Sequence, residues 1–419
     1  MQNDCFTKLL GIQGFVVKDI KMGKEGHRSC AVVDLSREQK EFVCSGCHEK
    51  VQEVIPYRER VIQHLSLWEH ISYLRFMQYR VICPRRGLKV EELSFVDRYS
   101  RVTVSLASLV YELCKVMTNK AVGILQGLDP TTVKTIDKTK LQEAQKNRPL
   151  DGISALGIDE IAVGKGQNNY WHLVSALDGP RGPEVIYVGE GRKEKHVQKF
   201  WKWFGKTRTS QIKVAVMDMW KGFINSFQAN CPGIAILYDK FHVIRHLLDA
   251  LNKVRNQELN RMNKRLKGLL TGKKFILLSR LAHVRGKARE SLNELLCASP
   301  RLYRAHFLKE SFSHLWSYKS KTWARKFWQT WKDSLKWSRL KPYLRFTKMV
   351  DKHFDGILAY CEHKLPLGFI EAANLKAKNI IRRAYGYQDK EYMKLKILQA
   401  CSSLGIFQPW ICSSFNNSS

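Results

Sequence analysis

The segment from 153 to 254 constrains the fold most, because its apolar stretches change rhythm in a fixed order. Three strand-like stretches come first: ISALGIDEIAVG, NYWHLVSALDG and EVIYVGEG. An amphipathic helix, KEKHVQKFWKWFG, then places Val197, Phe200, Trp201 and Phe204 on one face. A strand (IKVAVMDMW), a helix (KGFINSFQAN) and a strand running into a long helix (GIAILYDKFHVIRHLLDALNKVR) follow. This order predicts a mixed sheet, with antiparallel pairing in the meander and parallel pairing across the helical connections.

Carboxylates interrupt the apolar strands of this predicted sheet. The order of elements is that of a ribonuclease H-like core, in which the first and fourth strands lie side by side. Asp159 lies in the first strand, and Asp218 follows the fourth in the stretch VAVMDMWKGF. A buried carboxylate is costly unless it is paired or binds a metal ion. Each aspartate therefore caps a helix, pairs with a lysine, or ligates a metal.

Two divalent metal ions would give both aspartates a use. Carboxylates and water are the oxygen ligands that Mg²⁺ prefers. Two such ions about 3.5–4 Å apart activate the attacking oxygen and stabilise the leaving oxygen in phosphoryl transfer. Glu371, on a late helix, is the third candidate carboxylate, whereas Glu160 would face the opposite side of the strand from Asp159. The residues alone support the metal and the structural interpretations equally.

The charge of the chain favours a polyanionic partner. Lys and Arg total 71 against 38 Asp and Glu, which gives a net charge of +33. Nucleic acid is the expected partner, because each neutralised phosphate releases counterions; a membrane surface or a ribosome would also fit the charge. No apolar stretch is long enough to span a membrane, and no secretory signal is recognisable, so we expect a cytoplasmic, nucleoid-associated protein. The 11 cysteines suggest reduced thiols.

The segment TNKAVGILQGLDPTTVKTIDKTKL (118–141) predicts a helix-turn-helix. Thr118 would cap the first helix, Gly127 would end it, and Asp129 with Pro130 would open the second. The second helix would present to a DNA groove the residues Thr131, Thr132, Lys134 and Thr135. Two ordinary packed helices are the alternative.

A cysteine pattern near the N-terminus suggests an incomplete zinc finger. Cys44 and Cys47 form a C-x-x-C pair, and Cys83 begins a second pair that Arg86 leaves unfinished. A zinc ion would then need a fourth ligand. The candidates are His48 and Cys30. A degenerate finger without metal is the alternative.

The segment from 255 to 360 is predicted to be helical and basic. Trp323, Phe327 and Trp331 recur at i, i+4 and i+8, which predicts a core stripe; stacking on an unpaired base is the alternative. The polar stretch 142–152 reads as a linker, and the end FNNSS as a frayed tail.

Four motifs together resemble the bacterial insertion-sequence transposases of the ISL-three family. They are GIDEIAVGKGQNNYW, AVMDMWKGF, YDKFHVIRHL and IEAANLKAKNIIRRAYGYQDKEY, in that order. The resemblance covers nearly the whole chain. Members of this family are Asp-Asp-Glu (DDE) transposases with an N-terminal zinc finger and a helix-turn-helix, and they carry an all-helical insertion before the glutamate.

The resemblance implies a role for each matching residue. Asp159, Asp218 and Glu371 match the catalytic triad, which would hold two Mg²⁺ or Mn²⁺ ions. Asp239 and His242 match an accessory Asp-x-x-His pair; a purely structural histidine is the alternative. Phosphates would be held by basic residues of the glutamate helix, namely Lys376, Lys378, Arg382 and Arg383.

The expected fold class is α+β with several domains. A β-rich, zinc-finger-like region (1–95) precedes the helix-turn-helix (100–145). The ribonuclease H-like core (150–254) is interrupted by a helical insertion (255–360) and resumes at 361–400, before a tail at 401–419.

The expected function is DNA transposition. The protein would bind the terminal inverted repeats of its own element and catalyse cleavage and strand transfer, on element ends and target DNA, as a homodimer or larger assembly. The alternatives are a related metal-dependent DNA endonuclease and a decayed transposase that only binds DNA.

Overall fold

The computed structural model describes residues 2–38, 40–164, 166, 169–261, 268, 271–363, 365–384 and 386–406. The chain forms two compact units: Met1–Arg148 with Gly405–Ser419, and Pro149–Leu404. The boundary between them falls within the stretch 142–152, where the sequence predicts a linker. The end FNNSS lies outside the described residues. None of the described helices is long and apolar enough to cross a membrane.

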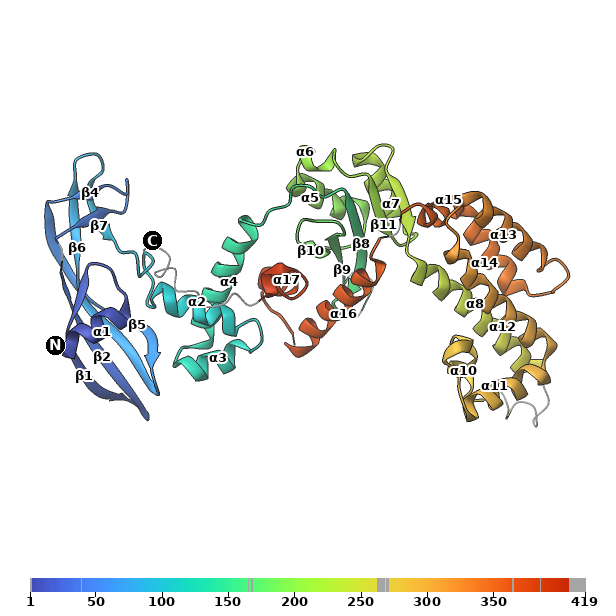
Figure 1. Ribbon diagram of the computed structural model, residues 1–419, viewed down its shortest axis with the longest axis horizontal. Helices are drawn as coiled ribbons and strands as arrows, with labels where there is room; N and C mark the ends of the chain where they lie inside the picture. The colour runs from blue at the N-terminus through green and yellow to red at the C-terminus, as the bar shows by residue number, and fades with distance from the viewer. Residues whose placement is uncertain are drawn as a thin grey trace. The chain divides into compact units, whose positions relative to one another are not determined.

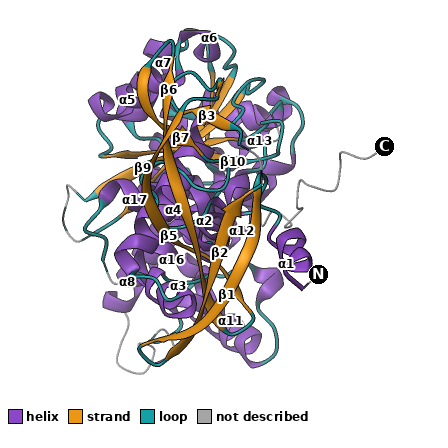
Figure 2. Cartoon of the chain, turned by 90° about the vertical axis from the view of Figure 1, so that its left-hand side faces the viewer, coloured by secondary structure: helices purple, strands orange, loops and turns teal. Residues whose placement is uncertain are grey.

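The first unit is built on a seven-stranded sheet with the order β1-β2-β6-β7-β3-β4, in which β5 pairs with β6 (Figure 2). A helix that the sequence did not predict, α1 (Gln2–Leu10), precedes it. The strands are β1 (Phe15–Glu25), β2 (Arg28–Arg37), β3 (Phe42–Cys44), β4 (Lys50–Val51), β5 (Val54–Leu67), β6 (His70–Cys83) and β7 (Gly87–Glu92). Phe15, Phe76 and Phe95 meet edge to face in its core.

Three helices complete the first unit: α2 (Val104–Leu113), α3 (Asn119–Gln126) and α4 (Pro130–Lys146). The predicted caps of the last two are confirmed. Thr118 accepts a hydrogen bond from the backbone of α3, and Asp129 accepts one from the first turn of α4. Gly127 ends α3 at φ 66°, in the left-handed region. A Cβ at Gly123 would lie 2.5 Å from the backbone oxygen of Leu128, so this tight turn requires glycine.

The second unit contains the mixed sheet that the sequence predicts. Its order is β10-β9-β8-β11-β12, where β8 to β10 are antiparallel and β11 pairs in parallel with β8 and β12 (Figure 1). The strands are β8 (Ala155–Ala162), β9 (Tyr170–Ala176), β10 (Glu184–Glu190), β11 (Val214–Met217) and β12 (Ala235–Tyr238). The first and fourth strands of the segment therefore lie side by side, as expected.

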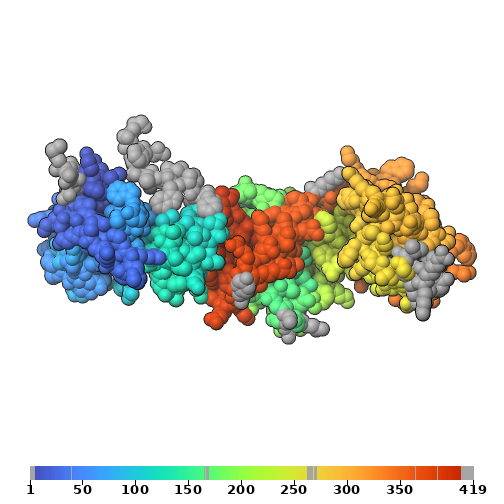
Figure 3. All heavy atoms as spheres, turned by 90° about the horizontal axis from the view of Figure 1, so that it is seen from below, coloured from blue at the N-terminus to red at the C-terminus, as the bar shows by residue number. Residues whose placement is uncertain are grey.

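Helices cover both faces of this sheet. On one face, α5 (Glu194–Phe204), with Phe200 and Trp201 buried, and α7 (Lys221–Asn230) pack on Leu156 and Ile158. The short α6 (Lys206–Thr209) follows α5. On the other face lie α16 (Leu367–Arg383) and α17 (Lys390–Ala400), which Figure 3 shows in red over the green part of the unit. A Cβ at Gly157 would lie 2.8 Å from Ile370 Cδ1, so α16 approaches β8 closely there.

The chain between β12 and α16 is helical in its described parts. The helices are α8 (Lys240–Arg261), α10 (Lys274–Leu278), α11 (Lys287–Ala298), α12 (Pro300–Phe312), α13 (Lys321–Asp333), α14 (Lys341–Lys352) and α15 (Phe354–Leu358). They share an apolar core. Short 3₁₀ turns occupy Leu281–His283, Ser313–Ser317, Ala359–Cys361 and Ser403–Gly405.

The predicted aromatic stripe of α13 is wrong at its first position. Trp323 is 60% exposed, whereas Trp328 and Trp331 are 2% and 4% exposed. The buried stripe runs through Ala324, Trp328 and Trp331 instead. Phe312 of α12 contacts the rings of both buried tryptophans, so the neighbouring helix selects this face.

Candidate active site

Three aspartates each come directly after one of three residues that lie side by side in the parallel part of the sheet. In the strand register, Met217 of β11 lies between Ile158 of β8 and Tyr238 of β12. The residues that come next along the three strands are Asp159, Asp218 and Asp239. The parallel register therefore places the three carboxylates at one level, where β11 and β12 end and β8 continues to Ala162. This level is the edge of the sheet referred to below.

Asp159 is the most buried of the candidate catalytic carboxylates, at 8% exposure. Its Oδ1 accepts a hydrogen bond from the Glu160 backbone at 2.7 Å, and its Oδ2 accepts one from Asn374 Nδ2 at 2.5 Å. Burial raises the pKa of Asp159 to about 6, although the nearby charge of His242 opposes this rise. A carboxylate held in this way gains from a bound cation.

The imidazole of His242 contacts the carboxylates of both Asp218 and Asp239. Its Nδ1 lies 3.1 Å from Asp239 Oδ2, and its Nε2 lies 3.8 Å from Asp218 Oδ2. The hydrogen bond to Asp239 raises the pKa of His242 to about 9, against the opposing effect of burial, and the charges of Asp218 and Asp159 add to the rise. The imidazole is therefore a cation among carboxylates at neutral pH.

Glu371 lies on α16, which packs on β8. Its neighbour Ile370 packs on Gly157, and Asn374, one helical turn later, bonds Asp159. Glu371 itself is exposed and makes no hydrogen bond or ion pair with the described residues. The structure thus joins Asp218, Asp239 and His242 by short contacts, and it places Asp159 near enough for the charges of His242 and Asp239 to affect its pKa. Glu371 makes no such contact with these residues, and it is linked to them only through its neighbours on α16.

The residues at this edge are of the types that bind a divalent cation, although their ligand atoms are not gathered within 4.8 Å of one another as the N-terminal thiols are. They offer carboxylate oxygens, which Mg²⁺ and Mn²⁺ favour, and two of these carboxylates, Asp159 and Asp239, are largely shielded from water. The buried Asn374 Oδ1 has no hydrogen-bond partner among the described residues. A cation would offset the cost of burying Asp159 beside two further aspartates.

Glu160 faces away from this edge, as its place on the strand predicts. It forms an ion pair with Arg192, whose Nη1 lies 3.2 Å from Glu160 Oε1. The guanidinium of Arg192 lies 4.4 Å from the ring centre of Tyr170 and 4.6 Å from that of Trp220. Glu160 is therefore occupied by a structural contact on the side opposite Asp159.

The sequence interpretation missed Asn374. The signal was present, because Asn374 follows Glu371 by three residues and so shares its side of the helix. An asparagine on a basic helix has many surface uses, and only the packing of α16 on β8 reveals its contact with Asp159.

The residues predicted to contact DNA lie at the surface or partly exposed. On α4, Thr131 and Thr135 are exposed, while Thr132 and Lys134 are half-buried. On α16, Lys376, Arg382 and Arg383 are exposed, while Lys378 is half-buried.

The N-terminal cysteines form a three-thiol cluster. The Sγ atoms of Cys44, Cys47 and Cys83 lie within 4.8 Å of one another, the only such group of three metal-binding side chains among the described residues. Neither proposed fourth ligand belongs to it: His48 is bonded to Glu92, and Cys30 lies on β2. The side chain of Arg86 packs beside Gly46 at this cluster.

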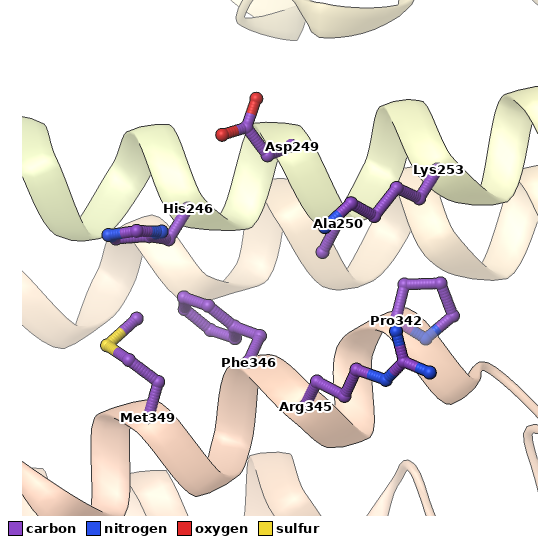
Figure 4. A pocket seen from close by; sticks show the side chains of 8 residues that line it. All are labelled: His246, Asp249, Ala250, Lys253, Pro342, Arg345, Phe346 and Met349. Carbon is purple, nitrogen blue, oxygen red and sulfur yellow. The ribbon is translucent and has the colours of Figure 1, made fainter.

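A separate pocket lies between α8 and α14 (Figure 4). His246, Asp249 and Lys253 line it from α8, and Arg345 and Met349 from α14. It contains none of the candidate catalytic carboxylates, so it is not part of the active site described above.

Comparison with known proteins identifies the family of the chain. A family model described as a transposase, of the ISL3 class of DDE transposases, matches residues 156–397. This range begins in β8 and ends in α17, so it spans the whole sheet and the helices that cover it. The chain belongs to the ISL3 family of insertion-sequence transposases.

Curated relatives carry matching descriptions. The transposase for insertion sequence element IS1001 of Bordetella parapertussis is 28% identical over 404 residues, 96% of this chain and 98% of that protein. The transposase for element IS1557 of Mycobacterium tuberculosis is 23% identical over 338 residues, 74% of each chain.

Proposed function

We propose that this transposase binds the terminal inverted repeats of its own insertion sequence and catalyses metal-dependent DNA cleavage and strand transfer. The row of Asp159, Asp218 and Asp239 at one sheet edge, with the helix that carries Glu371 packed on β8, is the observation that carries the proposal. The strand order of the second unit supports a ribonuclease H-like core, interrupted by the helices of 255–360 and resumed at 361–400.

Asp159, Asp218 and Glu371 would hold two Mg²⁺ or Mn²⁺ ions. Bound there, the ions would activate the attacking oxygen and stabilise the leaving oxygen of a phosphodiester. The chain itself positions the reactants: Asp239 orients His242, and the charged imidazole lies beside Asp218. Such chemistry rests on positioning and charge, and it requires no covalent protein intermediate.

The remaining parts would hold DNA. The α3–α4 pair would act as a helix-turn-helix, with Thr131, Thr132, Lys134 and Thr135 at the groove. The basic residues of α16 would bind phosphates: Lys376, Lys378, Arg382 and Arg383. Zinc bound to the thiols of Cys44, Cys47 and Cys83 would stabilise the fold of the β-rich region 1–95. Joining two element ends requires a homodimer or larger assembly, acting at the nucleoid in the bacterial cytoplasm.

A plasmid excision assay tests the proposal. Element ends would bracket a marker, and the wild type would be compared with Asp218→Ala and with Glu160→Gln. We expect excision by the wild type and by Glu160→Gln, and at least a 100-fold loss with Asp218→Ala while binding to the ends persists. Glu160→Gln is the matched control, since it changes an acidic residue next to Asp159 that faces away.

Three other results would contradict the proposal in different ways. Cutting without joining would identify an endonuclease. Binding without excision by any variant would identify a DNA-binding protein without activity. Equal excision by all variants would mean that the active site lies elsewhere.

A further inference from the structure

Asn374 carries a polar group that the rest of the fold leaves unused. The residue is 8% exposed, and its Nδ2 donates to Asp159 Oδ2. Its Oδ1 is buried and accepts no hydrogen bond from the described residues. A buried acceptor without a partner is destabilising, and in folded proteins it points to an ion or a water as the missing partner.

The contact with Asp159 fixes the orientation of the amide. With the amide reversed, Oδ1 would face Asp159 Oδ2, and two acceptor oxygens would oppose each other. Nδ2 therefore faces the aspartate and Oδ1 remains available. Packing does not demand an amide here, because the neighbouring buried positions on α16 are Ile370, Ala373 and Ala377.

We propose that Asn374 belongs to the metal site: its Nδ2 orients Asp159, and its Oδ1 is a neutral oxygen ligand for a divalent cation. This inference rests on the proposed function. Amide oxygens are ordinary ligands of hard cations. A neutral ligand also suits an edge that already gathers Asp159, Asp218 and Asp239, because a further carboxylate would add repulsion.

Mn²⁺ binding to the full-length protein without DNA provides the test, measured by calorimetry and by electron paramagnetic resonance of free Mn²⁺. We expect Asn374→Ala to weaken Mn²⁺ binding about 10- to 100-fold, the usual effect of removing such a supporting group. Asn379→Ala is the matched control, because Asn379 is an exposed asparagine on the same helix, and it should bind Mn²⁺ like the wild type.

Asn374→Asp separates the two roles of the amide. The variant keeps an oxygen at this position but loses the Nδ2 donor. If Oδ1 is a ligand, Asn374→Asp binds Mn²⁺ more tightly than Asn374→Ala, and Mn²⁺ raises its melting temperature more than that of Asn374→Ala. If it binds no more tightly than Asn374→Ala, the ligand role is wrong.

A structural role alone would give a different pattern. Asn374→Leu keeps most of the side-chain volume and removes both polar atoms, so it serves if Asn374→Ala does not fold. Mn²⁺ affinity equal to that of the wild type in a folded Asn374→Ala or Asn374→Leu protein would overturn the inference. Asp218→Ala distinguishes this from failure of the proposed function: if it also binds Mn²⁺ normally, the metal site itself is misplaced.

Discussion

At the scale of single residues, burial and hydrogen bonding together set the pKa values of the titrating groups in the second unit. Burial raises the pKa of the Asp159 carboxyl to about 6, while bonding to Asp239 raises the pKa of His242 to about 9. His172 shows the opposite case, because it is fully buried and, within the described part of the chain, only its Nδ1 has a hydrogen-bond partner, the Gly191 oxygen at 2.6 Å. Burial lowers the pKa of His172 to about 4.

His172 should make the second unit less stable in mild acid. The unfolded chain takes up a proton below the ordinary histidine pKa of about 6.5, whereas the folded chain does so only near 4. The free energy of unfolding therefore falls as the pH is lowered through this window, by about 2 kcal/mol at pH 5. Urea unfolding at pH 7.5 and pH 5 measures this loss.

The comparison variant is His172→Gln, since glutamine can still donate to the Gly191 oxygen. Its loss of stability between the two pH values should be smaller than that of the wild type by about 2 kcal/mol. Burial also lowers the pKa values of His64 and His306 to about 4, and these two residues contribute equally in both proteins. An identical loss in the variant would show that His172 is not responsible.

At the scale of elements, local sequence signals predict where a helix begins and ends, whereas tertiary packing decides which face of the helix is buried. The caps at Thr118 and Asp129 could be predicted because a capping side chain bonds its own helix. The buried face of α13 could not, because Trp323 and Trp328 are equally apolar and a residue of another helix, Phe312 of α12, packs on the second. The helix α1 was missed for a related reason, since a short N-terminal helix has weak periodicity of its own.

The residues of the candidate site also fall into two groups: those that the sequence could predict and those that only the tertiary packing reveals. Asp159 and Asp218 could be predicted because each interrupts or ends an apolar strand, and strand order then places them side by side. Asn374 could not, because its contact with Asp159 spans 215 residues of sequence.

The turn between α3 and α4 should be sensitive to substitution at Gly127. A Cβ there would lie 2.4 Å from Ile71 Cδ1, in addition to the strain of φ 66°. Gly26→Ala is the matched control, because Gly26 has φ 60° but open space around it. We expect Gly127→Ala to lower the free energy of unfolding of the first unit by about 1–3 kcal/mol more than Gly26→Ala. Equal losses in urea unfolding would mean that Ile71 moves aside freely.

At the scale of the whole molecule, the net charge of +33 should dominate DNA affinity. Each cation that neutralises a phosphate contributes roughly one unit to the slope of log affinity against log salt concentration. Arg382→Ala and Arg383→Ala should each reduce this slope by about one and weaken binding to all sequences alike. Fluorescence anisotropy at several salt concentrations measures the slope. Unchanged slopes would remove these two arginines from the DNA interface.

The contact between Asn374 and Asp159 also joins two residues that are synthesised at different times. The 215 residues between them take roughly 10–40 seconds to translate at about 5–20 residues per second. During that interval the first 148 residues, with the α3–α4 pair, have already been made, while α16 has not. The ribosome thus adds Glu371 and Asn374 well after the three aspartates, and a truncated chain that stops before α16 lacks both residues.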